Sequence, residues 1–140
     1  MMSLGLMFIS MFIIQYFFMS YIMTNRMDNM QNSFGKVYMS SIMGLFMVLL
    51  MVFMKRKINM THVILFTSLL LLIIYLYKEQ VGINDKEYLK EMVEHHSMAV
   101  LTSKQILNKT NNITVSNFAK QVLNTQEREI NEMKHIIKSI

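Results

Sequence analysis

The chain has 140 residues, of which 53% are hydrophobic and 16% are charged, whereas a soluble domain usually carries about a quarter charged residues. It contains no cysteine, which excludes disulfides and thiolate metal sites. The net charge of +5 does not indicate a nucleic-acid partner, because Lys55, Arg56 and Lys57 lie between apolar segments, where membrane topology explains them better.

The charges are distributed unevenly along the chain. Through Met54 there are only three charged side chains: Arg26, Asp28 and Lys36. Charged residues then recur every few positions in the C-terminal part. The sequence therefore predicts a transmembrane region over residues 1–78 and a polar region over residues 79–140.

Three predominantly apolar segments are predicted to cross a lipid bilayer as helices: residues 4–24, 37–54 and 60–77. The first segment would rise about 31 Å as a helix, which spans a bilayer core. A signal peptide fits it less well, because no basic residue precedes the apolar run and no small-residue cleavage site follows. The second segment carries Ser40, Ser41 and Gly44, small residues that allow close helix approach.

The basic residues predict the orientation of these spans. The short loop between the second and third spans carries Lys55, Arg56 and Lys57, whereas the first loop carries two basic residues. Basic residues favour the cytoplasmic side of a membrane. We therefore expect a multi-pass protein with a cytoplasmic N-terminus and an extracytoplasmic C-terminal region.

The polar region is predicted to form an antiparallel pair of helices over residues 85–108 and 114–139. Gly82 suggests a break, while Asn84 and Thr114 are plausible N-caps. Apolar residues recur at helical spacing along both segments. The overall fold class expected is all-α.

Polar residues interrupt the apolar stripe of each helix, at His96 on the first and at Gln126 and Glu129 on the second. When the helices are paired about a turn near Asn111, His96 falls opposite Gln126, and Met92 falls opposite Glu129 or Ile130. The interruptions then face each other, as mutual hydrogen bonding or a shared ligand would require.

Imidazole, thioether and carboxylate groups together suggest a metal site. Met92 and His96 lie four residues apart and share a helix face, while His95 and Met98 form a second pair turned about 100° away. Thioethers select copper(I), and imidazole suits copper, zinc and iron. The alternative is a hydrogen-bonded core histidine, since 17 of the 140 residues are methionine.

These segments resemble the DUF305 family over about residues 84–138. The resemblance rests on Met92 followed by the His95-His96 pair and Ala99, and on Gln126, Glu129-Ile130 and Met133 in the second helix. It implies a ferritin-like helical bundle in exported or membrane-attached proteins, some of which bind copper. Carried over residue by residue, it implies a site of six residues: Met92, His95, His96, Gln126, Glu129 and Met133. Met98 fits a His-His-Ser-Met-Ala variant, and the single helix pair departs from longer relatives that hold two.

A two-helix hairpin buries too little surface to be stable alone. The expected fold is therefore half of a ferritin-like four-helix bundle, completed by a second copy in a homodimer or higher homo-oligomer, or else docked on the membrane helices.

The function expected is a membrane-anchored metal-binding protein, with a copper ion as cofactor, in extracytoplasmic copper handling or tolerance. Met92, His96 and Met133 would be inner ligands, His95 and Met98 a second set, and Gln126 and Glu129 would orient the imidazoles. One alternative is a structural protein that oligomerises through the hairpin without metal. Another is a diiron oxidoreductase, although the inward Glu-x-x-His pairs of such centres are missing. We expect no catalytic residues and no small-molecule substrate.

Overall fold

The computed structural model describes residues 3–55 and 59–140, which fall into two compact units. The first unit holds the chain up to Met19 together with Phe34–Ile83, and the second holds Ser20–Ser33 together with Asn84–Ile140. The described residues are helical with no strand, which confirms the all-α class. Arg56 and Lys57, on which the predicted orientation partly depends, lie outside the described residues.

Three helical stretches are long and apolar enough to cross a membrane, as the sequence predicted. They are Leu4–Met23, α3 (Phe34–Phe53) and α4 (Met60–Lys78). The first is continuous through α1 (Leu4–Ile13), a π-helical turn η1 (Ile14–Met19) and α2 (Ser20–Met23). The boundary between the two units falls where the π-helical turn ends.

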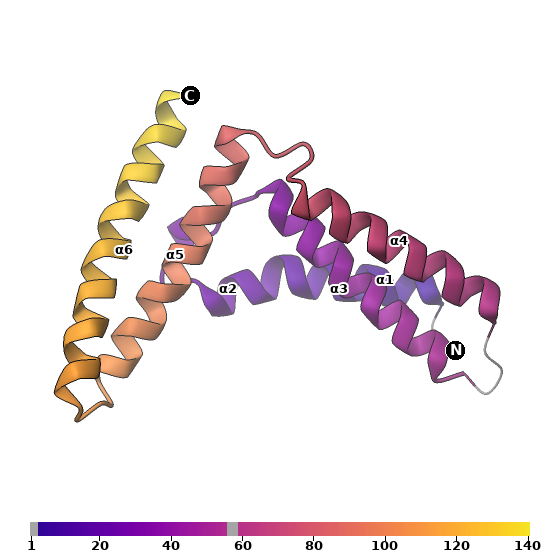
Figure 1. The fold of residues 1–140 in the computed structure, drawn as a ribbon, viewed down its shortest axis with the longest axis horizontal. Helices are drawn as coiled ribbons and strands as arrows, with labels where there is room; N and C mark the ends of the chain where they lie inside the picture. Colours follow the sequence, from indigo (N-terminus) through magenta and orange to yellow (C-terminus); the bar gives the residue numbers. More distant parts are fainter. Residues whose placement is uncertain (1–2, 56–58) are drawn as a thin grey trace. The chain divides into compact units, whose positions relative to one another are not determined.

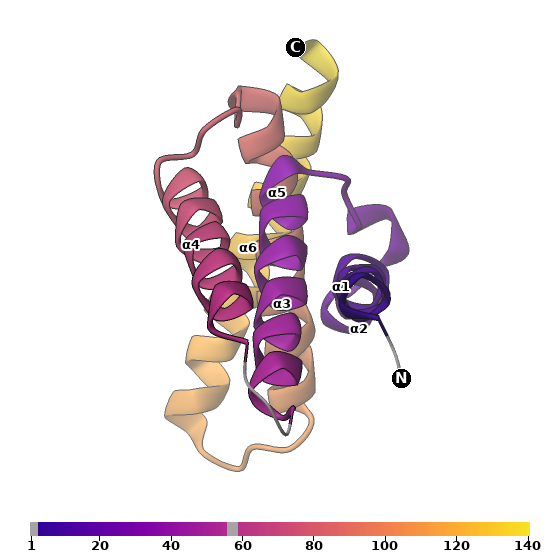
Figure 2. The same cartoon turned by 90° about the vertical axis from the view of Figure 1, so that its right-hand side faces the viewer.

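In the first unit α1 and α4 both pack against α3, and Figures 1 and 2 both show α3 beside α4. The buried cluster joins Ile42, Leu45 and Leu49 of α3 to Leu70 of α4. Gly44 lies against α1, where a Cβ atom would come within 2.8 Å of a Phe8 ring carbon and 3.2 Å of the Phe8 carbonyl oxygen. The absence of a side chain at Gly44 therefore sets how closely α1 and α3 approach.

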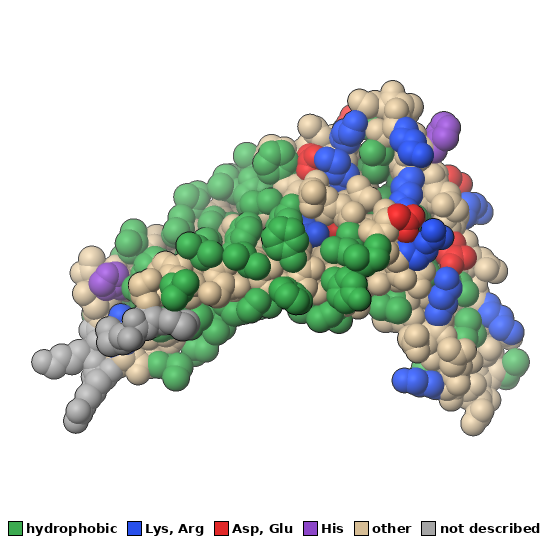
Figure 3. All heavy atoms as spheres, turned by 180° about the vertical axis from the view of Figure 1, so that it is seen from behind, with side chains coloured by type: hydrophobic (Ala, Val, Ile, Leu, Met, Phe, Trp, Pro, Cys, Tyr) green, Lys and Arg blue, Asp and Glu red, His purple; other side chains and the backbone are tan. Residues whose placement is uncertain are grey.

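Most other apolar side chains of the first unit face outward. Phe46, Leu50, Leu65 and Leu71 are each at least half exposed. Figure 3 shows hydrophobic side chains covering this unit, while Lys, Arg, Asp and Glu side chains gather on the second. An apolar outer surface on helices of this length is what contact with lipid requires.

Helix α4 ends in a tight turn that has the hydrogen bonds of a Schellman motif. The Val81 N–H donates to the Leu76 carbonyl and the Gln80 N–H to the Tyr77 carbonyl, both at 3.0 Å. Gln80 takes the left-handed backbone conformation at φ 54°, and Gly82 follows at φ 73°. The break predicted near Gly82 is therefore present, but a non-glycine residue occupies the capping position.

The second unit is built on α5 (Asp85–Leu107) and α6 (Ile113–Ser139), which lie side by side in Figure 1. Asn84 caps α5, since its Oδ1 accepts from the Glu87 N–H at 3.0 Å. Asn112 caps α6 by accepting from the backbone N–H groups of Thr114 and Val115. The prediction of Thr114 as the cap is thus wrong, because the amide two residues earlier reaches both orphan donors.

The core of the second unit joins both helices. Val93 and Val100 of α5 pack with Ile130 and Met133 of α6. The chain segment Ser20–Ser33, which includes α2 and a short 3-10 turn η2 (Met27–Asn29), also belongs to this unit. From the sequence, this segment was expected only as part of the transmembrane region.

Candidate functional site

His96 lies on the face of α5 that meets α6, with its side chain only 15% exposed. Its Nδ1 is 2.8 Å from the Met92 carbonyl oxygen, one turn earlier on the same helix. Its Nε2 is 3.0 Å from Oε2 of Glu129 on α6. Because a backbone carbonyl can only accept, Nδ1 carries the proton, and Nε2 is directed at a carboxylate.

Glu129 is held from two sides. Its Oε2 also accepts from the side-chain amide of Gln126, at 3.3 Å, one turn earlier on α6. The polar interruptions of the two apolar stripes therefore meet. His96 contacts Glu129 rather than Gln126, the residue expected opposite it.

The two inner methionines lie in the same helix interface. Met133 is buried in the core cluster with Val93 and Ile130, and Met92 packs against that cluster. The interface therefore contains an imidazole, a carboxylate and two thioethers from this one chain. Imidazole and thioether are the side chains that favour copper over hard cations such as Mg²⁺.

The other two predicted ligands lie elsewhere on α5. The side chain of His95 is 61% exposed, and its Nε2 is 4.0 Å from Glu91 on the same helix. Met98 is also exposed. The structure thus groups His96 with Glu129 and Gln126, and no contact joins His95 or Met98 to them. In the described ranges no three His, Asp or Glu side chains are close enough to hold a metal ion.

Two residues that flank the histidine pair, Glu94 and Ser97, were not predicted from the sequence. They lie three residues apart on α5 and hold the segment that follows α2. Ser97 is fully buried, and its Oγ accepts from the Asn25 N–H at 2.9 Å and from Nδ2 of Asn29 at 3.0 Å.

The carboxylate of Glu94 binds residues 20–33 through both of its oxygens. Oε1 accepts from the Gln31 N–H at 2.6 Å, and Oε2 accepts from the Ser20 hydroxyl at 3.0 Å. The sequence carries no signal for this second packing face, because only the structure shows that Ser97 is buried.

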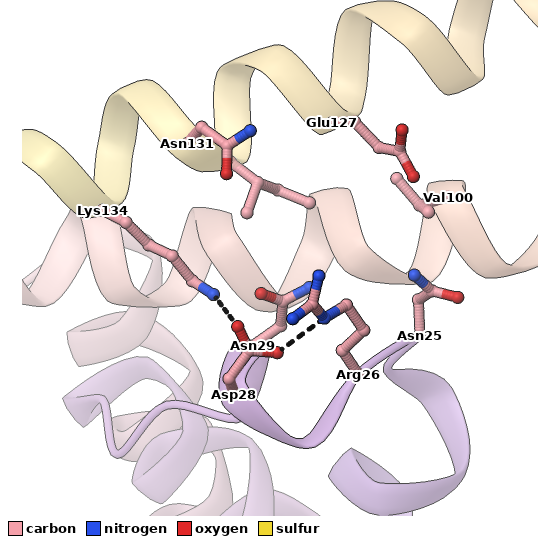
Figure 4. Close-up of a pocket in the computed structure, with 9 residues that line it drawn as sticks. Asn25, Arg26, Asp28, Asn29, Val100, Glu127, Asn131 and Lys134 are labelled. Atoms are coloured by element: carbon pink, nitrogen blue, oxygen red, sulfur yellow. Dashed lines mark hydrogen bonds and ion pairs between the residues drawn. The ribbon is translucent and has the colours of Figure 1, made fainter.

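A third attachment comes from α6. The Lys134 ammonium lies 2.8 Å from the Asp28 carboxylate, which the Arg26 guanidinium also contacts at 3.0 Å (Figure 4). The hydrogen bond from Lys134, supported by the positive charges of Lys134 and Arg26, lowers the pKa of Asp28 below its ordinary value of 3.8. Residues 20–33 are thereby fixed to both helices of the second unit.

Comparison with known proteins places this unit in a family. The profile described as "Domain of unknown function (DUF305)" matches residues 75–137, which run from the end of α4 almost to the end of α6. An uncharacterized protein of Acanthamoeba polyphaga mimivirus is 36% identical over 103 residues, covering 71% of this chain and 68% of the viral protein. No solved structure matches. The chain belongs to the DUF305 family.

Proposed function

We propose that this chain is a membrane-anchored metal-binding protein whose α5–α6 pair binds copper as cargo, for copper handling outside the cytoplasm. The observation that carries the proposal is the position of His96. Its Nδ1–H is held by the Met92 carbonyl, and its Nε2 points across the interface at Glu129. Metal-binding histidines are commonly oriented in this way, by a carbonyl that fixes the tautomer.

The residues around His96 suit a copper ion. Glu129 offers an oxygen ligand that now occupies the place facing Nε2, and Met92 and Met133 bring soft sulfur atoms to the same interface. His95 and Met98, both exposed, are the proposed second set. Gln126 would hold the Glu129 carboxylate in place.

Copper titration of the full-length protein in detergent tests this proposal. We expect His96→Ala to lower the affinity at least tenfold, with His135→Ala on α6 as the matched control for loss of an imidazole. Unchanged affinity in His96→Ala, or an equal loss in both variants, would contradict it.

The membrane orientation is part of the proposal. Residues 20–33 and the α5–α6 pair form one unit, so they must lie on the same side of a bilayer. The chain between them contains two candidate spans, α3 and α4, and two crossings return it to that side. With the basic loop at Lys55 inside, this side is extracytoplasmic.

The absence of native cysteine makes the orientation directly measurable. We expect Lys109→Cys, in the turn between α5 and α6, to react with an impermeant maleimide added outside intact cells. Lys55→Cys should react only after permeabilisation. The reverse pattern would overturn the orientation.

We further propose that two copies pair through their α5–α6 units to complete a four-helix bundle. Several apolar side chains of α6 that a partner could cover are exposed, among them Val115, Phe118 and Ile136. Crosslinking in mild detergent should then trap a dimer, and Phe118→Glu should reduce it. Exclusive recovery of monomer would contradict the pairing.

A second candidate function is assembly without metal. It is favoured by the fact that His96, Glu129 and Gln126 already satisfy one another across the interface. A network of this kind can specify how helices pair. In that case His96→Ala should abolish the dimer equally in chelator and in copper, whereas the metal-binding function predicts loss of copper affinity with the dimer retained.

A further inference from the structure

Methionine recurs at a fixed spacing along α3. Met39, Met43, Met47 and Met51 are each four residues apart, so each is rotated by only about 40° from the one before it. Each step rises about 6 Å, and the four together cover about 18 Å of a bilayer core that is about 30 Å thick. We refer to these four residues as the methionine ladder.

Helices α1 and α3 run in opposite directions across each other. Phe8 of α1 lies against Gly44 of α3. Tyr16, in the π-helical turn that continues α1, lies under the Lys36 ammonium near the start of α3, which is 4.7 Å from the ring centre. A later residue of the first span thus meets an earlier residue of α3, and these contacts fix which side of the pair each side chain occupies.

Two methionines of α1 lie on the same side of this pair as the ladder. Met7 and Met11 stand one residue before and three residues after Phe8, and the two middle ladder members stand in the same positions relative to Gly44. These positions are turned from the contact by about 100° and about 60° in the same sense. Because the helices are antiparallel, thioethers of α1 and α3 line one face of the pair.

The ladder faces away from α4. The buried residues of α3 pack against Leu70 of α4, whereas Met39 and Met43 are 40% and 37% exposed and the other two members are half-buried. Helix α4 is a candidate span of similar length, yet its sequence has a single methionine, Met60, at its first position. A general preference for apolar residues would place methionine in all three spans alike, so the ladder calls for another explanation.

The chemistry of the ladder suits one class of ion. Thioethers are soft ligands that select Cu(I). The stretch between Lys36 and Lys55 contains no Asp, Glu or His, the side chains that harder cations need. Methionine has three rotatable bonds, so a sulfur atom on one turn can reach towards the next. A monovalent soft cation could therefore be handed from turn to turn along α3.

We propose that the methionine ladder is a membrane-embedded binding path for Cu(I), closed by a second copy of this chain. In a single chain the exposed members face lipid, where a cation is costly. The same face of a second copy covers them and brings matching thioethers, so each ion is held by sulfur atoms of both chains and keeps its oxidation state. The path adds to the proposed α5–α6 site and uses none of its residues, so either proposal can fail alone.

Uptake of Cu(I) by vesicles tests the path. The full-length protein is reconstituted in phosphatidylcholine vesicles that hold an impermeant, coloured Cu(I) chelator, and Cu(I) kept reduced by ascorbate is added outside. We expect uptake about tenfold or more above protein-free vesicles, whose hydrocarbon core resists a charged ion. Ag(I), a soft cation of the same charge, should compete, and Zn(II) should not. Uptake at the protein-free level, or equal competition by Zn(II), would overturn the proposal.

Exchange of thioether for hydrocarbon locates the path. Met43→Leu/Met47→Leu conserves side-chain volume and apolarity, so the fold should be retained, as helical circular dichroism would show. We expect this variant to fall to the protein-free level, and the control Met27→Leu/Met60→Leu, at exposed methionines outside the ladder, to keep full uptake. If the double variant does not fold, Met39→Leu should lower the uptake on its own. Full uptake by a folded ladder variant would refute the path.

The same measurements separate the ladder from the α5–α6 site. Met43→Leu/Met47→Leu should keep the part of the copper affinity that His96→Ala removes, and His96→Ala should keep the uptake that depends on the ladder. Equal loss of uptake in both variants would assign the uptake to the α5–α6 site and overturn the ladder as an independent path.

Single cysteines test the second copy, because the chain has none of its own. Met39→Cys and Met43→Cys, made separately, should each form a disulfide-linked dimer when membranes are oxidised with iodine. Leu71→Cys, on α4 and 61% exposed, is the matched control and should remain monomeric. Absence of a dimer through both ladder positions, or a dimer through Leu71→Cys alone, would show that the ladder faces do not meet and would overturn the closed path.

Discussion

The carboxylate of Glu94 on α5 accepts a hydrogen bond of 2.6 Å from the backbone N–H of Gln31, 63 residues earlier in the chain. The same carboxylate binds the hydroxyl of Ser20, which lies in the last part of the first candidate span, so one side chain contacts residues near both ends of residues 20–33. Glu94 is thereby a structural residue of the second unit, although it directly precedes the His95-His96 pair.

Replacing Glu94 should therefore release this segment. Hydrogen bonds to a charged group contribute about 1.5–3 kcal/mol, so Glu94→Ala should raise the opened population about tenfold or more. Trypsin cleavage after Arg26, which needs an opened backbone, should accelerate by a similar factor. Glu132→Ala, at an exposed carboxylate on α6, is the control; equal cleavage rates in both variants would show that Glu94 does not hold the segment.

The two neighbouring histidines should differ in their effect on stability. His96→Ala removes the group between the Met92 carbonyl and Glu129, and should lower the free energy of unfolding by about 1–3 kcal/mol. His95→Ala, at an exposed position, should change it by less than about 0.5 kcal/mol. Chemical denaturation of metal-free protein in detergent measures both. Similar losses of unfolding free energy in the two variants would mean that the two imidazoles contribute equally to stability, contrary to the prediction.

Gly44 should tolerate no side chain. Gly44→Ala puts a Cβ atom 2.8 Å from the Phe8 ring and 3.2 Å from its carbonyl, so α1 or α3 must shift. Overpacking of this kind costs about 1–3 kcal/mol. Gly5→Ala, where nothing lies within 4 Å, should be neutral or stabilising because alanine favours the helix. In thermal unfolding in detergent, Gly44→Ala should have a lower melting temperature than the wild type, and Gly5→Ala should not. An unchanged melting temperature for Gly44→Ala would contradict the prediction.

Gln80 offers a stabilising substitution. It caps α4 in the left-handed conformation, which costs a side-chain-bearing residue about 1 kcal/mol that glycine avoids. Its side chain also donates to the Tyr77 carbonyl, and losing that exposed bond offsets part of the gain. We expect Gln80→Gly to stabilise by about 0.5 kcal/mol, whereas Gln121→Gly, at an exposed position in the interior of α6, should destabilise by about 1 kcal/mol.

Attachment of residues 20–33 should depend on pH in the acid range. Because Lys134 lowers the pKa of Asp28 in the folded state, the contribution of this pair is complete above the ordinary value of 3.8 and is lost as the pH falls through the lower folded value. Asp28 is more than half exposed, so the effect should be small and weakened by salt. Backbone amide hydrogen exchange of residues 20–33, measured across this pH range relative to that of α6, should rise less in Asp28→Asn as the pH falls. An identical acid response in the wild type and in Asp28→Asn would show that Asp28 does not cause the pH dependence.

Helix content and the apolar spans followed directly from the sequence, because both are properties of local segments. An uninterrupted run such as Leu69–Ile74 has no polar side chain, and in an apolar environment a helix satisfies its backbone N–H and C=O groups within the segment itself. The start of α6 was misplaced by one residue because Asn112 and Thr114 are both good caps, and only backbone geometry decides between them.

Only the part of the site that lies on the periodic apolar stripes of the two helices could be predicted from the sequence. The polar interruptions at His96 and Glu129 appear as breaks in two stripes, and the structure brings those residues within hydrogen-bonding distance. The attachment of residues 20–33 to Ser97 and Glu94 could not be read from the sequence. It joins residues separated by two candidate spans, and a segment without periodicity gives no register against a helix.

The long sequence separation of these contacts has a consequence for biosynthesis. Asp28 leaves the ribosome more than a hundred residues before its partner Lys134, which is 106 positions away. Until α6 is made, Asp28 lacks Lys134 and has the neighbouring Arg26 as its ion-pair partner. Residues 20–33 can therefore adopt their final form only after α6 has been synthesised, so chains truncated before α6 would remain open to quality-control proteases.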